Sequence, residues 1–560
     1  MTPGESDGLE ATFASFVPLD RLRALARGQA LPDRARGAAL TGDLSSFTPL
    51  VTELRKSLAA KRAAEEITRH LNAIFTPIID ITHRFGGSVI GFAGDALTCW
   101  FDGDDGIRAT AAGLAMQRSI ADVRPVELPG GRRVSVGIRI AVVAGNVRRF
   151  LLGDPGLQCF DTLAGSLLDR LEGGLRVAEQ AEVLVGKEVA AARGGDLDVA
   201  GPRTSAGGEE FLSVVGLTSS VEPLSREELP RVPAALLRPW VPHQIASRLA
   251  SGGDSFLGEV RPVVAVFIRF DGGHYDDPRA DGRPLDDYVR FVQRTVAELE
   301  GDVVELTLGD KGSYLYVVFG ATVAHENDAM RAARAAMALR APPGDLALGH
   351  RPQIGISTGE MRVGTYGSPV RRGYGVQGQE VNVAARLMTA AAPGDILVSQ
   401  RVADAIAHRV AVEAVGELAL KGIDSPVQVC RLLHERDVAS PASSERAGPP
   451  LVGRASERAA MIAALDRVMS GASEVVFIEG PAGIGKSRLL GALVSFARDR
   501  GLEVRTGAAE EIERRRPYGV WTQVARAVFG IAAGDEGAVA RARVLERLAG
   551  VPDAEAVLPL

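Results

Sequence analysis

The chain has 560 residues and a formal net charge of −6, so it is long enough for several domains and shows no basic excess for binding nucleic acid. Its three cysteines, Cys99, Cys159 and Cys430, form no CxxC pair, which argues against a zinc site or a disulfide framework and fits a reducing cytoplasm. We find no signal-peptide pattern and no apolar run near the ~20 residues of a membrane-spanning helix, so we expect a cytoplasmic protein with no membrane partner.

The first block of predicted elements opens with a short apolar strand in ARGAALTGDLSSFTPL that ends at Asp43. A long helix follows, because apolar residues recur at helical spacing in KRAAEEITRHLNAIFTPIIDITHRFGG and two glycines stop it. Two apolar runs, 88–92 and 97–101, then flank Gly94 and predict a β-hairpin with Asp95 in its tight turn. A helix in DDGIRATAAGLAMQRSIADV and a strand in RVSVGIRIAVVAG complete this part of the block.

A second block repeats the order of the first: a strand in VRPVVAVFIRFDG, a helix in LDDYVRFVQRTVAELEG, a strand–turn–strand in DVVELTLGDKGSYLYVVFG, a helix and a strand. A repeat of about 215 residues indicates a duplicated domain, and helices alternating with strands around a hairpin favour an α+β fold. We therefore divide the chain into an N-terminal segment (1–34), a first domain (35–218), a connector (219–257), a second domain (258–436), a flexible linker (437–450) and a third module (451–560).

The third module holds the most specific short motif. EVVFIEGPAGIGKSRLL reads as a buried strand, a loop from Gly480 to Gly485, and a helix that begins with Lys486 and Ser487. Such a loop wraps phosphates, with the lysine on the β/γ-phosphates and the serine on Mg²⁺, so we expect a second nucleotide here. The preceding LVGRASERAAM resembles the entry of AAA-like and STAND signalling ATPases. No Walker B acidic strand follows, so we expect a truncated module and do not predict hydrolysis.

Three segments carry a family resemblance. LTGDLSSFTPL, GGSVIGFAGDALTCWF and YGVQGQEVNVAARLM resemble, in the same order, the two metal segments and the N-x-A-[AS]-R segment of class III nucleotidyl cyclases. The tandem arrangement ahead of a P-loop module is most similar to soluble adenylyl cyclases. The resemblance implies an α+β fold class with two ferredoxin-like cyclase domains forming an internal pseudo-heterodimer, followed by a partial α/β P-loop NTPase domain. It implies conversion of ATP to 3′,5′-cyclic AMP and pyrophosphate with two Mg²⁺ ions, which Mn²⁺ can replace.

The resemblance also implies roles for individual residues, and the chemistry agrees with them. Mg²⁺ prefers carboxylate oxygens, and the charge that develops on a phosphoryl group during displacement requires an arginine. The implied metal ligands are Asp43, Asp95 and the backbone of Leu44. The implied catalytic pair is Asn382 for the ribose and Arg386 for the phosphoryl group. The implied triphosphate ligands are Lys421, Ser45, Ser46, Phe47 and Thr48.

The two domains hold complementary parts of this inventory. The first has both metal aspartates, whereas the second has Arg269 in place of the first of them; Asn382, Arg386 and Lys421 occur only in the second. Family sites form between two domains, so the chain is expected to build one composite site and one degenerate site. The implied degenerate positions are Gly91, Asp169, Arg170 and Arg269. In soluble adenylyl cyclases bicarbonate acts there through a basic pair, but the lysine position is Gly91 in this chain, so we do not predict bicarbonate sensing.

The base pocket departs from the adenylyl pattern. The adenine-selecting lysine of the family falls at Glu305, and its partner falls at Gly375. A glutamate suits N1–H of guanine, so GTP stays an alternative substrate, although the architecture favours ATP. A second interpretation is that Glu305 points away and pairs with Lys311 or a neighbouring arginine. A different class of function also stays open: a signalling ATPase scaffold whose cyclase domains only bind nucleotide.

Overall fold

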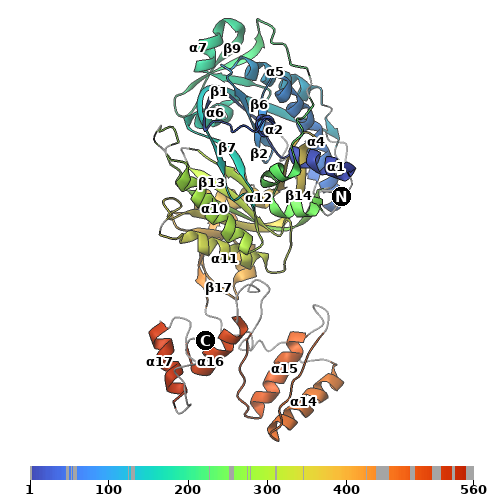
Figure 1. The fold of residues 1–560 in the computed structure, drawn as a ribbon, viewed down its shortest axis with the longest axis vertical. Coiled ribbons are helices and arrows are strands. Elements are labelled where there is room, and N and C mark those ends of the chain that lie inside the picture. Colours follow the sequence, from blue (N-terminus) through green and yellow to red (C-terminus); the bar gives the residue numbers. More distant parts are fainter. Residues whose placement is uncertain are drawn as a thin grey trace. The chain divides into compact units, whose positions relative to one another are not determined.

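The computed structural model divides the chain into two compact units, Met1–His434 and Glu435–Leu560 (Figure 1). Its described residues are those outside the following positions: 1–2, 46–49, 52, 55–57, 59, 124, 128–132, 226–227, 251–257, 274, 278, 280, 310–311, 345, 424, 437–452, 480–485, 508–518, 532–536 and 550–560. Among the described helices, none combines the length and the apolar character needed to cross a bilayer.

The first unit contains two mixed sheets with helices. The first is an eight-stranded sheet of order β2-β3-β1-β6-β8-β10-β9, with β7 paired to β6. Its strands and helices, with a separate two-stranded β4–β5 pair and the 3-10 turn η1, are β1 (Arg34–Ser45), α4 (Ala60–Arg84), β2 (Ser88–Ala93), β3 (Ala96–Asp102), α5 (Ile107–Ala121), β4 (Val126–Glu127), β5 (Arg133–Val134), β6 (Gly137–Leu152), β7 (Phe160–Ala164), α6 (Ser166–Val177), β8 (Val183–Gly186), α7 (Lys187–Arg193), η1 (Gly194–Asp196), β9 (Leu197–Thr204) and β10 (Glu210–Leu217).

The second sheet of this unit has the matching order β12-β13-β11-β14-β16-β18-β17, with β15 paired to β14. Its elements are β11 (Glu259–Phe270), α10 (Arg283–Glu298), β12 (Asp302–Thr307), β13 (Ser313–Phe319), α11 (Asp328–Arg340), β14 (Gln353–Ser368), β15 (Arg371–Gln377), α12 (Gln379–Ala390), β16 (Ile396–Ser399), α13 (Gln400–Ile406), β17 (Val410–Leu418) and β18 (Val427–Glu435). The elements expected from the repeated sequence pattern therefore occur in both halves of the unit.

Strand register makes the two halves comparable residue by residue. In each sheet the long central strand pairs in parallel with a short strand, β6 with β8 and β14 with β16, and in antiparallel with the first strand. Leu40 of β1 pairs with a residue of β6 that also pairs with β8. Val266 of β11 likewise pairs with a residue of β14 that also pairs with β16, so Leu40 and Val266 occupy equivalent positions. Three residues further along each strand are Asp43 and Arg269, so Arg269 occupies the position of Asp43, as predicted.

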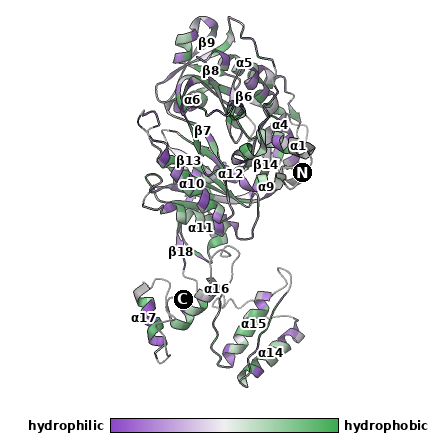
Figure 2. Ribbon diagram, in the orientation of Figure 1, coloured by the Kyte–Doolittle hydropathy of each residue, from purple (hydrophilic) through white to green (hydrophobic). Residues whose placement is uncertain are grey.

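Each half has its own apolar core between helices and sheet. In the first half, Phe75 and Leu71 of α4 pack with Leu40 and Val142 of the sheet. In the second half, the buried faces of α10 and α11 cover strands β11 to β14. Figure 2 shows that these two helices carry both hydrophobic and hydrophilic residues, as expected for helices that cover a sheet.

Helices from two distant parts of the sequence share a third apolar cluster with the second sheet. These are α1 (Pro3–Ala14) and α2 (Leu19–Ala26) of the N-terminal segment, and α8 (Ala234–Leu237), the 3-10 turn η2 (Arg238–Trp240) and α9 (His243–Ala250) of the connector. Phe13 and Leu22 pack there with Ile245 of the connector and with Val263 and Phe267 of β11. The connector thus contributes two short helices and a 3-10 turn to this cluster.

The second unit contains α14 (Ala455–Met469), α15 (Lys486–Asp499), α16 (Gly519–Phe529) and α17 (Gly537–Arg547). Helix α15 begins where the P-loop motif predicts a helix. The buried strand expected ahead of that loop is wrong: residues 472–479 form no strand, and Phe477 is 90% exposed. A buried strand needs neighbours that accept its hydrogen bonds, and the described residues of this unit provide no other strand.

Candidate functional site

The two predicted metal carboxylates lie on neighbouring strands. Across the β1–β3 pair, Asp43 lies opposite Ala96, the first residue of β3. Asp95 precedes Ala96 in the hairpin turn, and the backbone N–H of Leu44 donates a hydrogen bond to the carbonyl oxygen of Asp95 (3.3 Å). Strand pairing therefore brings together the three residues predicted to bind metal.

A two-residue turn holds Asp95 at the tip of its hairpin. Gly94 has φ +65°, a left-handed conformation that an L side chain adopts only under strain, so a glycine is suited to this position. The turn follows β2 and precedes β3, which confirms the hairpin predicted around Gly-Asp. Asp95 is partly exposed at this tip.

An arginine that the sequence analysis missed holds Asp43. Arg139 of β6 lies directly opposite Asp43, and its Nε and Nη2 both donate to Asp43 Oδ2, at 2.9 and 2.5 Å. The pair is partly exposed, with side-chain exposures of 38% and 19%. Only the register of β1 against β6 shows this contact, because the two residues are 96 positions apart. The arginine adds a positive group beside the β2–β3 hairpin.

The predicted catalytic pair lies on the exposed face of α12. Asn382 and Arg386 are exposed and one helical turn apart, while Val383 and Leu387 on the opposite face are buried. Leu420, which precedes Lys421, packs against that buried face. Because Lys421 follows a residue anchored on α12 and is itself exposed, the three predicted polar residues belong to one local structure.

A hydrogen bond joins the strand that precedes α12 to the β2–β3 hairpin. Gln377, the last residue of β15, donates from Nε2 to the carbonyl oxygen of Gly94 (3.4 Å). Helix α12 begins at Gln379, two residues later. The strand that leads into the Asn382/Arg386 helix therefore ends beside the turn that carries Asp95.

Contacts between the two halves are nearly symmetric. Near the end of β14, the N–H of Gly367 donates to Asn72 Oδ1 of α4 (3.0 Å). Near the end of β6, the N–H of Gly153 donates to Asp286 Oδ1 of α10 (2.7 Å). Each half thus places the long helix that follows its first strand against the central strand of the other half. This arrangement positions α12 near the β2–β3 hairpin of the first half and α6 near the β12–β13 hairpin of the second half.

The positions predicted to form a degenerate site show the second of these relationships, between α6 and the second half. A Cβ added to Gly309, in the β12–β13 connection, would lie 3.4 Å from Asp169 Oδ1 of α6. A Cβ added to Gly312 would meet the guanidinium of Arg269. Arg170, another of the implied degenerate positions, donates to Glu209 Oε1 (2.8 Å) and forms an ion pair with Glu188. Two carboxylates thus hold its charge.

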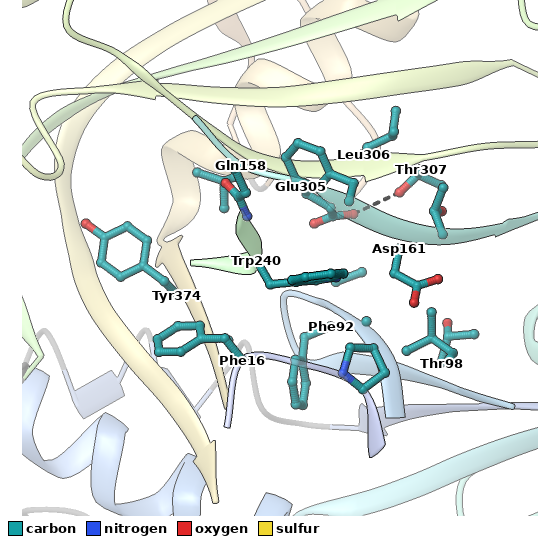
Figure 3. A pocket seen from close by; sticks show the side chains of 18 of the residues that line it. Phe16, Phe92, Thr98, Gln158, Asp161, Trp240, Glu305, Leu306, Thr307 and Tyr374 are labelled. Carbon is teal, nitrogen blue, oxygen red and sulfur yellow. Dashed lines mark hydrogen bonds between the residues drawn. The ribbon is translucent and has the colours of Figure 1, made fainter. Parts of the chain in front are cut away.

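A cavity of about 230 Å³ lies between the two halves (Figure 3). The first half lines it from β2 and β7, the second half from β12 and β15, and the N-terminal segment and connector through Phe16 and Trp240. Gly91 and Glu305 both line the cavity. Gly91 and Glu305 occupy equivalent positions in the two sheets. Each follows a bulge in its strand, and each pairs with the matching residue of the next strand, Thr98 for Gly91 and Tyr316 for Glu305.

Glu305 faces the cavity and accepts two hydrogen bonds at Oε1, from Thr307 Oγ1 (2.9 Å) and from the hydroxyl of Tyr314 (3.2 Å) (Figure 3). Burial raises the pKa of its carboxyl, and the two hydroxyl donors offset this in part. Among the described residues no cation pairs with Glu305, which corrects the alternative of an ion pair with a neighbouring arginine; Lys311 lies outside those residues.

The other base-pocket position is glycine for a steric reason. Gly375 pairs with Gly364 across β14 and β15, and a Cβ at Gly375 would lie 3.0 Å from the ring of Tyr366. Tyr366 packs edge-on against Phe92 of the first half, with ring centroids 5.4 Å apart. The space that a polar side chain at 375 would need is therefore occupied by an aromatic ring that spans the two halves.

Two predicted phosphate-binding segments lie partly outside the described residues. Ser45 is the last residue of β1, and its backbone pairs with Gly137 of β6. Ser46, Phe47, Thr48, Gly480 and Gly485 lie outside the described residues. Lys486 and Ser487 open α15.

A buried arginine that the sequence analysis also missed joins β15 to β2. The guanidinium of Arg371 donates to the carbonyl oxygens of Val89 (2.9 Å), Ile90 (2.8 Å) and Phe16 (2.9 Å), and to that of Arg372 (2.9 Å). Its pKa is lowered to about 10 because it is buried. Backbone carbonyls of the first half and of the N-terminal segment thus fix one wall of the cavity.

Comparison with known proteins gives two domain matches. The profile described as "Adenylate and Guanylate cyclase catalytic domain" matches residues 285–433, and that described as "AAA ATPase domain" matches residues 450–559. Adenylate cyclase type 10 of Oryctolagus cuniculus is 23% identical over 499 residues, which cover 81% of this chain. The protein of the same name from Rattus norvegicus is 22% identical over 495 residues, with the same coverage. The chain spans 30% of the length of each relative.

Solved structures give weaker similarities. A class III adenylyl cyclase-like ATP-binding protein from Pseudomonas aeruginosa is 15% identical, and the similarity covers 70% of this chain and 92% of that chain with a TM-score of 0.46. The adenylyl cyclase CyaB from P. aeruginosa is 23% identical over 32% of this chain and 97% of that chain, with a TM-score of 0.28.

Proposed function

We propose that this chain, which carries a class III cyclase domain and an AAA ATPase domain, converts ATP into 3′,5′-cyclic AMP and pyrophosphate at one site between its two sheets. In this proposal residues 35–218 are a metal-donating domain, residues 258–436 are an Asn/Arg-donating domain, and the two form an internal pseudo-heterodimer. The second, degenerate site has no catalytic set and is available for regulation.

The hydrogen bond from Gln377 to Gly94 carries this proposal. It connects the strand before the Asn382/Arg386 helix to the turn that presents Asp95. Two residue sets that the sequence distributes over different halves of the chain thus adjoin each other.

The carboxylates at this place fit a divalent metal. Asp43 and Asp95 offer oxygen ligands on adjacent strands, and Asp43 already forms an ion pair with the guanidinium of Arg139. Mg²⁺ is usually held by one or two carboxylates together with substrate phosphates and water, so two aspartates and a backbone carbonyl such as that of Leu44 suffice. When bound, the metal ions would activate the ribose 3′-hydroxyl and neutralise charge on the triphosphate.

The chain's own residues provide orientation and charge stabilisation. Asn382 binds the ribose and holds its 3′-oxygen in line with the α-phosphate. Arg386 stabilises the charge that develops on the α-phosphoryl group, while Lys421 and the backbone near Ser45 bind the departing pyrophosphate. Arg139 would exchange Asp43 for a phosphate oxygen when substrate and metal are bound, because the guanidinium and a divalent cation would otherwise share one carboxylate.

The second unit binds a further nucleotide at Lys486 and Ser487, and this binding regulates the cyclase in our proposal. The three cysteines are buried free thiols, which supports a cytoplasmic location.

Product analysis tests the proposed reaction. Purified chain is incubated with ATP or GTP and either Mg²⁺ or Mn²⁺, and the products are separated by chromatography. We expect 3′,5′-cyclic AMP, and none from the Arg386→Ala variant. Cyclic GMP as the main product would favour the second candidate, a guanylyl cyclase. The observation behind this candidate is the carboxyl of Glu305 in the cavity, because a carboxylate suits N1–H of guanine. Nucleotide binding without either product would contradict the proposed activity and favour a scaffold.

A further inference from the structure

A buried arginine of the second half contacts residues on both sides of the interface between the halves. Arg362, on β14, is 2% exposed. Its Nε donates to Thr68 Oγ1 of α4 (2.8 Å), its Nη2 to the carbonyl oxygen of Thr365 (2.9 Å) and its Nη1 to Gln377 Oε1 (3.4 Å). Helix α4 belongs to the first half and packs along β14 (Figure 1). The guanidinium therefore joins α4 of one half to the end of β15 in the other.

Backbone atoms enclose the contact between Arg362 and Thr68. A Cβ added to Gly258, ahead of β11, would lie 2.5 Å from Thr68 Oγ1 and 2.8 Å from Arg362 Nε. Burial lowers the pKa of Arg362 to about 10, so the guanidinium is still positively charged at neutral pH. Among the described residues no carboxylate forms an ion pair with it, and its charge is held by neutral oxygen atoms.

Gln377 continues this contact to the hairpin turn that carries Asp95. Its Oε1 accepts from Arg362, and its Nε2 donates to the carbonyl oxygen of Gly94 (3.4 Å). A guanidinium has only donors and a carbonyl oxygen only accepts, so both partners require the same orientation of the amide. At 3.4 Å both hydrogen bonds are longer than is usual, so we expect them to affect orientation more than stability.

The first half has an arginine at the equivalent position. Val142 of β6 pairs with both β1 and β8, and Ile356 of β14 pairs with both β11 and β16, so these two residues correspond. Arg148 lies six residues beyond Val142, and Arg362 lies six residues beyond Ile356. Both arginines are buried. The duplicated fold thus provides an internal comparison for Arg362.

The two arginines differ in their partners. Arg362 lies opposite Gln377 across β14 and β15, whereas Arg148 lies opposite Ala164 across β6 and β7. The methyl group of an alanine can neither accept nor donate a hydrogen bond. Arg148 also forms an ion pair with Asp33 (3.4 Å), whereas the described partners of Arg362 are uncharged. The arginine–glutamine link therefore leads to the helix of the proposed catalytic pair, α12, and has no equivalent ahead of α6.

We propose that Arg362 and Gln377 are positioning residues, which hold the turn that carries Asp95 in place against the catalytic helix α12. This inference rests on the proposed function, because it concerns the alignment of the composite site. The proposed metal ligands and the proposed catalytic pair belong to different halves, so a shift of one half against the other moves the metal away from the phosphoryl group. A misplacement of about 1 Å can lower a rate by about 100-fold. Neither residue has to contact the nucleotide to have this effect.

Two substitutions at position 377 test the link. Gln377→Met keeps the length of the side chain and removes both hydrogen bonds. Gln377→Glu can still accept from Arg362 but cannot donate to Gly94. We expect kcat for cyclic AMP formation to fall about tenfold or more in each variant, with a much smaller change in KM for ATP and in the melting temperature. Wild-type kcat in either variant would overturn the inference.

Arg362→Met and Arg148→Met form a matched pair. Each replaces a buried guanidinium at equivalent positions of the two halves by an apolar side chain of similar length. Activity is expressed per folded chain, with the folded fraction taken from thermal melting. Arg362→Met should lower kcat as Gln377→Met does, whereas Arg148→Met should leave it close to wild type. Equal losses of kcat in the two variants would overturn the inference, because the effect would then not depend on the link through Gln377.

A distance measurement tests the positioning without catalysis. Spin labels are attached to Ala93→Cys in the β2–β3 hairpin and to Thr389→Cys on α12, both at exposed positions. The three native cysteines are buried and do not compete for the label. Pulsed electron paramagnetic resonance gives the distribution of distances between the labels in the full chain. We expect a narrow distribution with Gln377 and a broader or shifted one with Gln377→Met.

The two measurements separate this inference from the proposed function. A changed distance distribution in Gln377→Met, with no cyclic product from any chain, contradicts the proposed catalysis while the positioning of the hairpin stands. Cyclic AMP formation with an unchanged distribution in Gln377→Met overturns the positioning role alone. A changed distribution with wild-type kcat overturns it as well, because the position of the turn would then not affect the reaction.

Discussion

Arg139 forms a forked hydrogen bond with Asp43, in which Nε and Nη2 both donate to Oδ2 at 2.9 and 2.5 Å. The arginine therefore competes with any metal ion for this carboxylate oxygen. Binding a divalent cation without nucleotide requires breaking the pair and placing two positive groups side by side. In the proposed site, the resting charge balance of the hairpin would thus disfavour a metal ion until the triphosphate of the substrate is bound.

Arg139→Ala should raise the affinity of the nucleotide-free chain for Mn²⁺. A partly exposed ion pair contributes up to about 1 kcal/mol, so the gain is expected to be severalfold. Titration of Mn²⁺ followed by electron paramagnetic resonance measures it. Arg139→Lys, which keeps the charge but not the fork, should show a smaller gain. An unchanged affinity in the alanine variant would show that the pair does not compete with metal.

Asp95→Asn tests the lone carboxylate of the hairpin turn. Asparagine has the same size and also favours turns, but it lacks the charge that Mg²⁺ needs. Cyclase activity should fall at least about a hundredfold, while the melting temperature changes little because the side chain is partly exposed. Activity and thermal melting are measured on the same preparation. Retained activity would contradict the assignment of Asp95 as a metal ligand.

Mixing two inactive variants tests whether one chain builds the whole site. Asp95→Asn removes a residue of the first half, and Arg386→Ala removes one of the second. Because Gln377 and Gly94 join these halves within one chain, each variant chain contains a single damaged site, and a mixture should stay inactive. Co-expressed and co-purified chains provide the test. Restored turnover would indicate that two chains contribute to each site.

The sequence predicts local features of the site well and long-range contacts poorly. The Gly94-Asp95 turn and the shared face of Asn382 and Arg386 follow from spacing over a few residues. The partners of Arg139 and Arg371 depend on strand register and on packing between halves. A short stretch of sequence encodes neither the register nor the packing, so sequence reasoning misses both arginines.

Wrong predictions have the same origin. The apolar run EVVFIEG was predicted to be a buried strand, but burial of a strand depends on neighbours elsewhere in the chain. Phe477 is exposed where no such neighbours are described. Glu305, by contrast, is assigned to the base pocket by the family pattern. A strand bulge precedes Glu305, and the matching bulge in the first half precedes Gly91, so the two residues are structurally equivalent.

Arg371→Met should destabilise the first unit. The substitution keeps much of the apolar stem but leaves the carbonyl oxygens of Val89, Ile90 and Phe16 without their donor. Each lost hydrogen bond costs about 1 kcal/mol, so we expect a loss of about 2–4 kcal/mol in the free energy of unfolding. Urea unfolding measures it. Arg401→Met, which removes an ion pair whose arginine side chain is 70% exposed, is the control and should change stability by less than about 1 kcal/mol.

Asp302→Asn should stabilise the chain in a pH-dependent manner. The carboxyl of Asp302 is partly buried and accepts a hydrogen bond from Thr322, and its pKa is raised to about 6 by burial. In the unfolded chain the group ionises near its ordinary pKa of about 4, so between these values the folded state holds the extra proton. Above about pH 6 the folded protein therefore carries an unfavourable charge that asparagine lacks, while the amide oxygen can still accept from Thr322.

The gain should be about 3 kcal/mol near pH 7, decline as the pH falls through 6, and vanish below about pH 4, where the carboxyl is protonated in both states. Denaturant unfolding of wild type and variant at several pH values measures this difference. Asp404→Asn, at an exposed helix position, is the control and should give a small change that does not follow this course. A constant difference between Asp302→Asn and wild type at all pH values would show that the carboxyl is not held neutral by burial. The position would then act through packing alone, because only a difference in proton binding between folded and unfolded states makes a stability change depend on pH.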